Sequence, residues 1–498
     1  NYLFDDFIAN SEIGMGYMPS NPAVGTIWRV FLLPLLYLGV EPQNMYDILS
    51  LLTLILNALS GYLLARVLKA PIALSLLAGL LFMGLDNVDA RLQSHLTLAA
   101  TFGLLFQFSS AILAAQNSRP IYFVLLGITS WLSFQVVEYY GLYGGVGSVI
   151  IFAGYFAITP SHDCSFIARL KILSFNGLIA ATTFFALMIL SYPTMIAAKL
   201  GWGSENISIL ERVAYNYAEL EVYSVRNVFQ LFDSHFWSLG NYGNPGEFTF
   251  RIGAFIPIAI IGFTVLSIIF EKSQSIKFRI SRYSQTFVFG FCAIVFVAIG
   301  LHPENPFSAS RILFDFAPMF RVVARAYIVV DICVIAILMV VATRYLTLLD
   351  SMHLKLSSHV AFMMVAILLL VLAFLDAAGG GIKILAPKQL PITHSLFDEL
   401  LNEKSGAVIE LPFHNSRAAP HDSYEYLYNW SQHKHKLVNA PFSAVRKSDQ
   451  GLANKIDSFS EDVNYLNENV IRKLGKHGVR YIVVNCPAID DSYISKLA

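Results

Sequence analysis

A small set of ionisable residues beside long apolar stretches forms the candidate site of this chain. Acidic residues lie near its start and beside two later stretches, and two arginines open another. The set is Asp5, Asp6, Asp86, Asp89, His95, Glu138, Arg321 and Arg325. An ionisable group in or beside a membrane-spanning segment costs on the order of several kcal/mol unless it is paired or hydrated. These side chains are therefore the first places to look for function.

Carboxylates and arginines gathered at one membrane face suit transfer of a sugar from a lipid-linked phosphate. Arginine offers phosphate a planar, permanently charged pair of donors. A carboxylate can accept the proton of an attacking hydroxyl group. A divalent cation such as Mg²⁺ or Mn²⁺ would use oxygen ligands to bridge carboxylate and phosphate, and Asp6 and Asp89 are the candidate ligands. We expect six of these residues to contribute to substrate binding: Arg321, Arg325, Asp86, Asp89, His95 and Glu138.

Each of these residues also has a purely structural interpretation. The adjacent pair Asp5 and Asp6 is equally typical of a solvated loop or a helix N-terminus. Asp86 and Asp89 would suit caps for a helix that begins near His95. The two arginines could anchor a span at the lipid headgroups, and the glutamate next to two tyrosines could simply be hydrated. The sequence leaves both interpretations open.

The overall composition excludes most soluble classes of protein. The chain has 498 residues, of which 56% are apolar and 14% charged, and its mean hydropathy is +0.58. A soluble domain carries about a quarter charged residues. Net charge is zero, which gives no basic field to attract nucleic acid, and the four cysteines show neither metal-ligand nor disulfide-framework spacing. The composition indicates a membrane protein that crosses the bilayer many times.

The apolar segments predict an α-helical polytopic protein with about 10 to 11 transmembrane helices. The predicted spans are 46–68, 70–85, 95–115, 120–137, 139–158, 168–192, 252–270, 284–301, 324–343 and 358–376. An eleventh apolar run over 24–39 is short and holds Arg29 and Pro34, so we interpret it as an interfacial or re-entrant helix.

Loop charges predict which membrane face each loop occupies. Alternate loops carry eleven basic residues against three acidic ones, and by the positive-inside rule that face is cytoplasmic. The candidate site residues then lie on the other face, which we expect to be the outer side of a bacterial inner membrane. An external start also predicts a further helix before Asn1.

A change in charge density divides the chain into two predicted domains. About a tenth of residues 1–384 are charged, against about a quarter of residues 385–498. Within the second part, the patterns over 392–403 and 461–474 predict helices, and those over 407–413 and 479–485 predict strands. We therefore predict a membrane domain over 1–384 and a small extracytoplasmic α/β domain over 385–498.

Several motifs, in order along the chain, resemble bacterial polytopic proteins of the GT-C glycosyltransferase superfamily. They are the span pair leading to His95-Leu96, SFQVVEYYGLYGGV, APMFRVVARAYIVV, and GAVIELPF, LVNAPFS and GVRYIVVN in the tail. The resemblance implies a GT-C-like membrane fold, a polyprenyl-phosphate sugar donor and an acidic catalytic residue in the first outer loop. Asp5 or Asp6 lies where that acid would fall, and Asp6 is preferred.

Three functions remain open at this point. The first is an inverting glycosyltransferase of the membrane. The second is a non-catalytic GT-C-like scaffold within a membrane complex, which would need partner subunits. The third is a transporter or lipid flippase, which would have internal symmetry and helices broken near the midplane; the sequence shows no convincing repeat. The first hypothesis predicts that the first-loop acids, Asp86, Asp89 and the arginines line one cavity.

Overall fold

The computed structural model describes only part of the chain, and all structural statements concern that part. It comprises residues 30–31, 34–35, 37–40, 42–92, 96–117, 119–158, 166–191, 217–234, 236, 250–271, 284–316, 322–352, 356–377, 400, 407–411, 436–437, 468–476 and 479–484. The chain divides into two compact units. One consists of 24–191 with 215–385, and the other includes 386–498.

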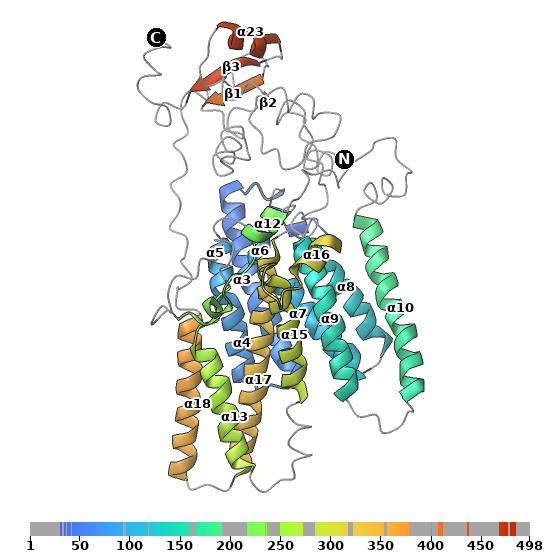
Figure 1. The fold of residues 1–498 in the computed structure, drawn as a ribbon, viewed down its shortest axis with the longest axis vertical. Coiled ribbons are helices and arrows are strands. Elements are labelled where there is room, and N and C mark those ends of the chain that lie inside the picture. Colours follow the sequence, from blue (N-terminus) through green and yellow to red (C-terminus); the bar gives the residue numbers. More distant parts are fainter. Residues whose placement is uncertain are drawn as a thin grey trace. The chain divides into compact units, whose positions relative to one another are not determined.

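The larger unit is a bundle of apolar helices (Figure 1). Its long helices are α3 (Pro42–Val67), α4 (Ile72–Gly84), α7 (Phe102–Asn117), α8 (Pro120–Val136), α9 (Glu138–Ile158), α10 (Phe166–Ser191), α13 (Phe255–Phe270), α15 (Ser284–Gly300), α17 (Tyr327–Ser351) and α18 (Leu356–Ala377). Each of the ten apolar segments in the sequence thus coincides with a helix.

The helices make this a polytopic helical membrane protein. Among the described residues, six helices are long and apolar enough to cross a bilayer, or seven if the bent pair α4 and α5 (Asp86–Leu92) counts as one span. Large apolar side chains are also exposed around the bundle, among them Leu51, Phe175, Ile261 and Leu368. Such a perimeter is unfavourable in water and suits a hydrocarbon environment.

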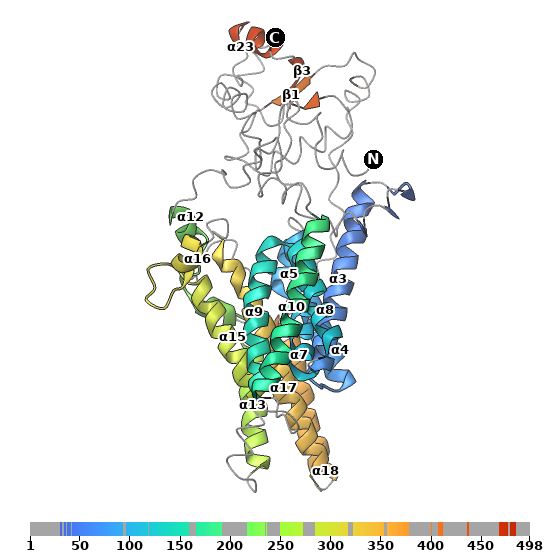
Figure 2. The same cartoon turned by 90° about the vertical axis from the view of Figure 1, so that its right-hand side faces the viewer.

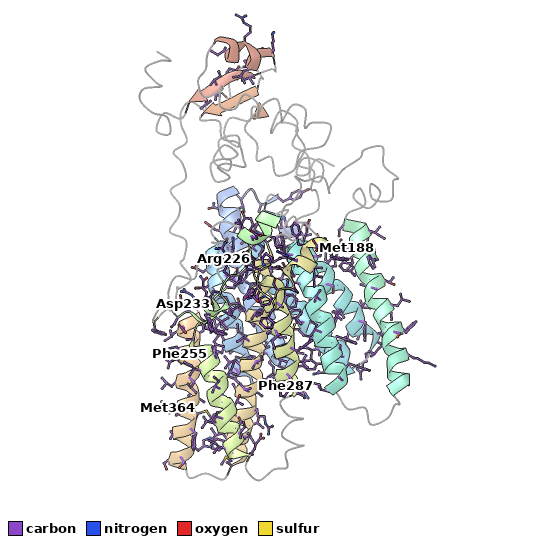
Figure 3. All side chains as sticks on the ribbon, in the orientation of Figure 1. Met188, Arg226, Asp233, Phe255, Phe287 and Met364 are labelled. Carbon is purple, nitrogen blue, oxygen red and sulfur yellow. The ribbon has the colours of Figure 1, made fainter. Side chains whose placement is uncertain are left out.

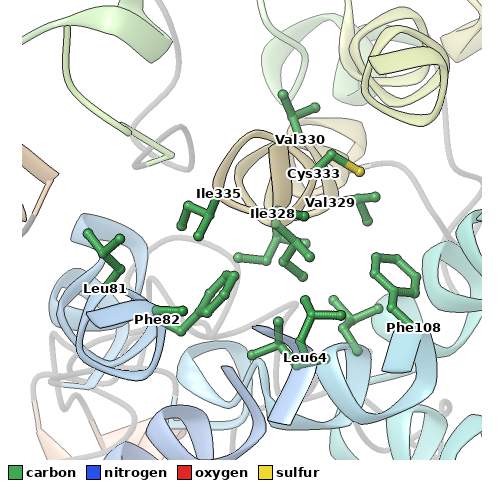
Figure 4. Packing of buried hydrophobic residues seen from close by; sticks show 14 of the residues in the cluster. Leu64, Leu81, Phe82, Phe108, Ile328, Val329, Val330, Cys333 and Ile335 are labelled. Carbon is green, nitrogen blue, oxygen red and sulfur yellow. The ribbon is translucent and has the colours of Figure 1, made fainter. Parts of the chain in front are cut away.

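Helix α17 is at the centre of the bundle. Its residues from Tyr327 to Met339 are almost all buried on every face, as expected for a helix that is apolar all round. Figure 4 shows Ile328 and Ile335 directed toward Phe82 of α4 and Leu64 of α3. The other inner helix, α7, is similarly buried, whereas α10 lies at the outside of the bundle beside α8 and α9 (Figures 1 and 2).

Glycines allow the inner helices to approach closely. A Cβ atom on Gly79 of α4 would lie 2.6 Å from the Ala58 carbonyl oxygen of α3. One on Gly103 of α7 would lie 2.8 Å from the Ser133 Cα atom of α8. Both distances are shorter than real contacts permit, so these pairs depend on the missing side chain. Small residues at helix contacts are the usual means of packing in membranes, where no hydrophobic force draws helices together.

At one end of the bundle the helices are broken. Helices α4 and α5 meet at a bend of 43°. A short α6 (Leu96–Ala99) is followed by a two-residue interruption before α7, and Val137 is extended between α8 and α9. The structure therefore corrects two sequence expectations. Asp86 and Asp89 lie in the first turn of a helix of their own. Glu138, which the predicted spans left between two helices, is the first residue of α9, and Val137 separates α9 from α8.

A buried ion pair lies at the other end. Arg344 of α17 contacts Glu271, the residue that follows α13. Helix α13 has 16 residues, so at 1.5 Å per residue about 24 Å separates Glu271 from the N-terminal end of that helix. The charge rule assigns both residues to the same membrane face, and the structure brings them together.

The smaller unit has four described elements. Strand β1 (Ala407–Leu411) lies between β2 (Lys436–Leu437) and β3 (Val479–Val484), and both pairings are parallel. Helix α23 (Glu468–Lys476) precedes β3. The predicted helix at 392–403 lies outside the described residues except for Leu400.

Candidate functional site

The clearest charged contact at the broken end joins residues that are far apart in sequence. Arg251 Nε donates to Asp86 Oδ2 at 2.6 Å, and its Nη1 lies 3.9 Å from Asp233 Oδ2. The Arg251 and Asp86 side chains keep 28% and 19% exposure, so solvent or a headgroup can reach them. One guanidinium thus bridges two carboxylates at the surface of the bundle.

Backbone hydrogen bonds explain why Arg251 and Asp233 meet. Asp233 follows the 3₁₀ turn η1 (Val228–Phe232), and the Ile252 amide donates to the Leu231 carbonyl at 3.0 Å. This bond brings Arg251, which precedes Ile252, close to Asp233, which lies two residues after Leu231. Figure 3 shows Asp233 near Phe255, where α13 begins.

The same loop is anchored by a buried carboxylate at the end of α18. Asp376 accepts a hydrogen bond from Ser234 Oγ at 2.5 Å and another from the Phe255 amide at 3.0 Å. The second bond satisfies a free N–H group in the first turn of α13, where the helix dipole favours negative charge. Gly253 has φ of +76° and packs against this carboxylate. Asp376 therefore fixes the segment that carries Arg251.

Arg325 lies in a short 3₁₀ turn, η3 (Val323–Ala326), that leads into α17. Its guanidinium carbon lies 4.8 Å from the centre of the Tyr139 ring, within range of a cation–π contact. The Val322 amide also lies 3.5 Å from the Tyr139 hydroxyl. The start of α9 thus supports the turn that carries Arg325.

Asp331 connects the two groups of charges. It lies on α17, is 1% exposed, and neither carboxylate oxygen has a hydrogen-bond partner among the described residues. It is close enough to Asp86 to interact electrostatically, and the Tyr140 phenol interacts with both Asp331 and Arg325. Acidic and basic side chains from α5, α9, η3 and α17 therefore share one neighbourhood. An unbonded ionisable group inside a span is a functional candidate in itself.

Two side chains stabilise the break between α6 and α7. Asn57 of α3 donates to the Ala99 carbonyl at 2.8 Å and accepts from the Phe102 amide at 3.0 Å. The Tyr140 hydroxyl donates to the Leu98 carbonyl at 2.5 Å. Irregular backbone at membrane depth needs such partners because no water is present to satisfy it.

The structure brings together only some of the predicted site residues. Asp86 and Arg325 belong to the shared neighbourhood. Asp89 and Glu138 lie in the first turns of α5 and α9, where acidic side chains also favour the helix dipole. The remaining predicted residues lie outside the described part of the chain: Asp5, Asp6, His95 and Arg321.

Sequence reasoning missed Arg251 and Asn57. Arg251 precedes a span by only a few residues, like many anchoring arginines, and its partner Asp86 is 165 positions away. Asn57 is a single uncharged residue in an apolar run. The only feature of the sequence that could have drawn attention to Asn57 is that a polar amide side chain is unfavourable in an apolar membrane segment.

The described residues contain no group of three or more His, Cys, Asp or Glu side chains arranged to hold a metal ion. Asp89, one of the two predicted metal ligands, therefore belongs to no such group in the described part of the chain. The other predicted ligand, Asp6, lies outside that part. No protein-family model, curated protein or solved structure matches this chain.

Proposed function

We propose that the chain is an integral-membrane glycosyltransferase that moves one sugar from a polyprenyl-phosphate donor. The observation that carries this proposal is the meeting of acids and arginines at the broken end of the bundle. Arg251 bridges Asp86 and Asp233, and the Tyr140 phenol interacts electrostatically with both Arg325 and Asp331. The finer parts of the proposal are a GT-C-like fold, an external α/β domain and a place in a bacterial inner membrane, with this end facing outward.

The proposed reaction requires a base and a cation on opposite sides of one carbon atom. The acceptor hydroxyl oxygen attacks the anomeric carbon, and the bond from that carbon to the phosphate oxygen breaks with inversion. The hydroxyl proton passes to Asp6, or to Asp5 in its place. The bonding electron pair leaves with the phosphate, whose charge Arg325 and Arg321 balance.

The remaining candidates would hold the donor in place. Carboxylates such as Asp86, Asp89 and Glu138 accept hydrogen bonds from sugar hydroxyls, and His95 can do so as a neutral ring. The partial exposure of Asp86 leaves its carboxylate within reach of a headgroup. Holding both substrates at the lipid boundary contributes to the rate through positioning alone.

The second candidate function is a non-catalytic scaffold of a membrane complex. The close Arg251–Asp86 bond favours it, because an ion pair that is already satisfied also suits a structural fastening between α5 and the start of α13. In that case the exposed apolar perimeter would contact partner subunits as well as lipid.

A transfer assay separates the two functions. The protein, purified in lipid nanodiscs, is incubated with radiolabelled polyprenyl-phosphate sugars, and release of labelled sugar to an acceptor is measured. We expect transfer by the wild type and by the control Arg472→Ala, a change at an exposed residue of α23, and loss of transfer in Asp6→Asn and Arg325→Ala.

Two outcomes would contradict the proposal in different ways. Full transfer by both Asp6→Asn and Arg325→Ala would remove the site assignment while leaving the activity. Absence of transfer by the wild type with every donor, together with stable co-purification of other membrane subunits, would favour the scaffold.

A further inference from the structure

A cavity of about 540 Å³ lies among α7, α8, α9 and α10, within the helix bundle. This volume falls in the range of pockets that bind small molecules. Its walls are almost entirely apolar and include Phe152 of α9 and Phe184 of α10. Its polar wall residues are Gln107, Ser130 and Ser148. Ser130 accepts a hydrogen bond from Gln107 Nε2 at 3.0 Å, whereas Gln107 Oε1 and Ser148 Oγ are buried without a partner among the described residues. Apolar atoms still make up most of the wall. The cavity therefore suits an apolar occupant.

Glycines on two facing helices keep this space open. A Cβ atom added to Gly145 of α9 or to Gly177 of α10 would meet no other heavy atom within 4 Å, and both residues line the cavity. At Gly127 of α8, by contrast, a Cβ atom would collide with Thr183 of α10. Helices α8 and α10 are thus in contact, while the region around Gly145 and Gly177 is unfilled by protein. The apolar side chains around an unfilled space lack the dispersion contacts that neighbouring atoms would give them.

The mouth of the cavity opens toward the bilayer. Val149 and Phe185 line the cavity and are 69% and 61% exposed. Beside them on α10, Phe175 and Leu178 are 66% and 63% exposed. Because α9 and α10 meet the criteria for membrane spans, the medium at this mouth is lipid hydrocarbon.

The volume fits one lipid chain. Pockets of about 300–1,000 Å³ hold a molecule of drug size, so the cavity of about 540 Å³ has room for a single hydrocarbon chain. Phospholipid acyl chains make up the hydrocarbon at its mouth, so an acyl chain is the occupant closest at hand.

We propose that this cavity binds one acyl chain of a bilayer phospholipid, which enters between α9 and α10. The site is separate from the charged neighbourhood at the broken end and does not depend on the proposed enzymatic function. Bound in this way, the chain supplies the packing that the protein itself lacks between the two helices.

The test uses a phospholipid with a photoreactive diazirine near the end of one acyl chain. The full chain is reconstituted with this lipid in nanodiscs and irradiated, and labelled residues are located by mass spectrometry. We expect label on the inner wall residue Phe152 and on its neighbours in the cavity. Label on the exposed perimeter measures the background.

Two cavity-filling variants and one matched control decide the result. Gly145→Leu and Gly177→Leu place a side chain where there is space and should lose most of the label at Phe152. Gly290→Leu is the control, because its Cβ also meets nothing within 4 Å but Gly290 lies on α15, away from the cavity. All three changes favour helix formation, so folding should survive, which thermal unfolding verifies.

Three results would overturn the proposal. One is a wild type without label on the cavity wall. Another is equal wall labelling in Gly177→Leu and Gly290→Leu. The third is displacement of the label by added polyprenyl phosphate, which would assign the cavity to an isoprenoid chain.

Discussion

Asn57 should be among the most important polar residues for the stability of the bundle. It is fully buried, and its amide contacts both sides of the break, donating to the Ala99 carbonyl and accepting from the Phe102 amide. Asn57→Ala removes both bonds. The Ala99 carbonyl keeps a bond from the Thr101 amide at 3.1 Å, whereas the Phe102 amide loses its acceptor in a buried region that water does not reach, so we expect α6 and α7 to lose their fixed relation.

The cost can be bounded from two kinds of measurement. Hydrogen bonds between membrane helices contribute on average about 0.6 and at most about 1.7 kcal/mol each. A buried group left without a partner costs about 1–3 kcal/mol. The Phe102 amide is left without a partner and the Ala99 carbonyl loses one of its two bonds. We therefore expect Asn57→Ala to lower the free energy of unfolding by about 2–4 kcal/mol. That corresponds to a folding equilibrium constant reduced by roughly 30-fold to 1,000-fold.

Unfolding in mixed detergent micelles, followed by circular dichroism, measures this loss. The matched control is Asn117→Ala. Asn117 is exposed and makes a single hydrogen bond within its own helix, to the Leu113 carbonyl at 3.0 Å. We expect it to cost less than about 0.5 kcal/mol, as exposed substitutions generally do. Equal losses in the two variants would refute the role of Asn57 at the break.

Two further predictions concern other buried contacts, with the same unfolding measurement. Gly253→Ala should cost at least about 1–2 kcal/mol, because φ of +76° strains an L-residue and the new Cβ meets the Asp376 carboxylate; Gly290→Ala, with open space around it, should be neutral or stabilising, and a matching loss there would contradict the argument. Arg344→Met should cost about 3–5 kcal/mol by removing the guanidinium partner of buried Glu271. The double variant Arg344→Met with Glu271→Leu should regain most of the lost free energy of unfolding. If it does not, the two residues do not act as a pair.

Much of the bundle follows from the sequence because a lipid environment restricts the choices. An apolar run of about 20 residues has to satisfy its own backbone groups, and a helix does so within the segment. This explains why all ten apolar segments are helical. The bends at Leu85 and before Phe102 have no comparable signal. Their backbone groups are satisfied by residues elsewhere in the chain, such as Asn57.

The candidate site could be predicted only in part for a similar reason. The grouping of ionisable residues on one predicted face drew attention to Asp86 and Arg325. The structure places Asp86 within electrostatic range of Asp331 and Arg325 over the Tyr139 ring. It did not indicate Arg251, the residue that actually contacts Asp86. A contact across 165 positions depends on the packing of the whole bundle.

The sequence by itself determined that this chain crosses a membrane repeatedly, where its helices lie, and which end of the bundle gathers charge, since all three follow from local hydrophobicity and from the order of charged loops. Only the tertiary structure decided that Arg251 bridges two carboxylates, that Asn57 spans a broken helix and that glycines leave a lipid-sized cavity. These features depend on distances between segments that are remote along the chain, which no local pattern encodes.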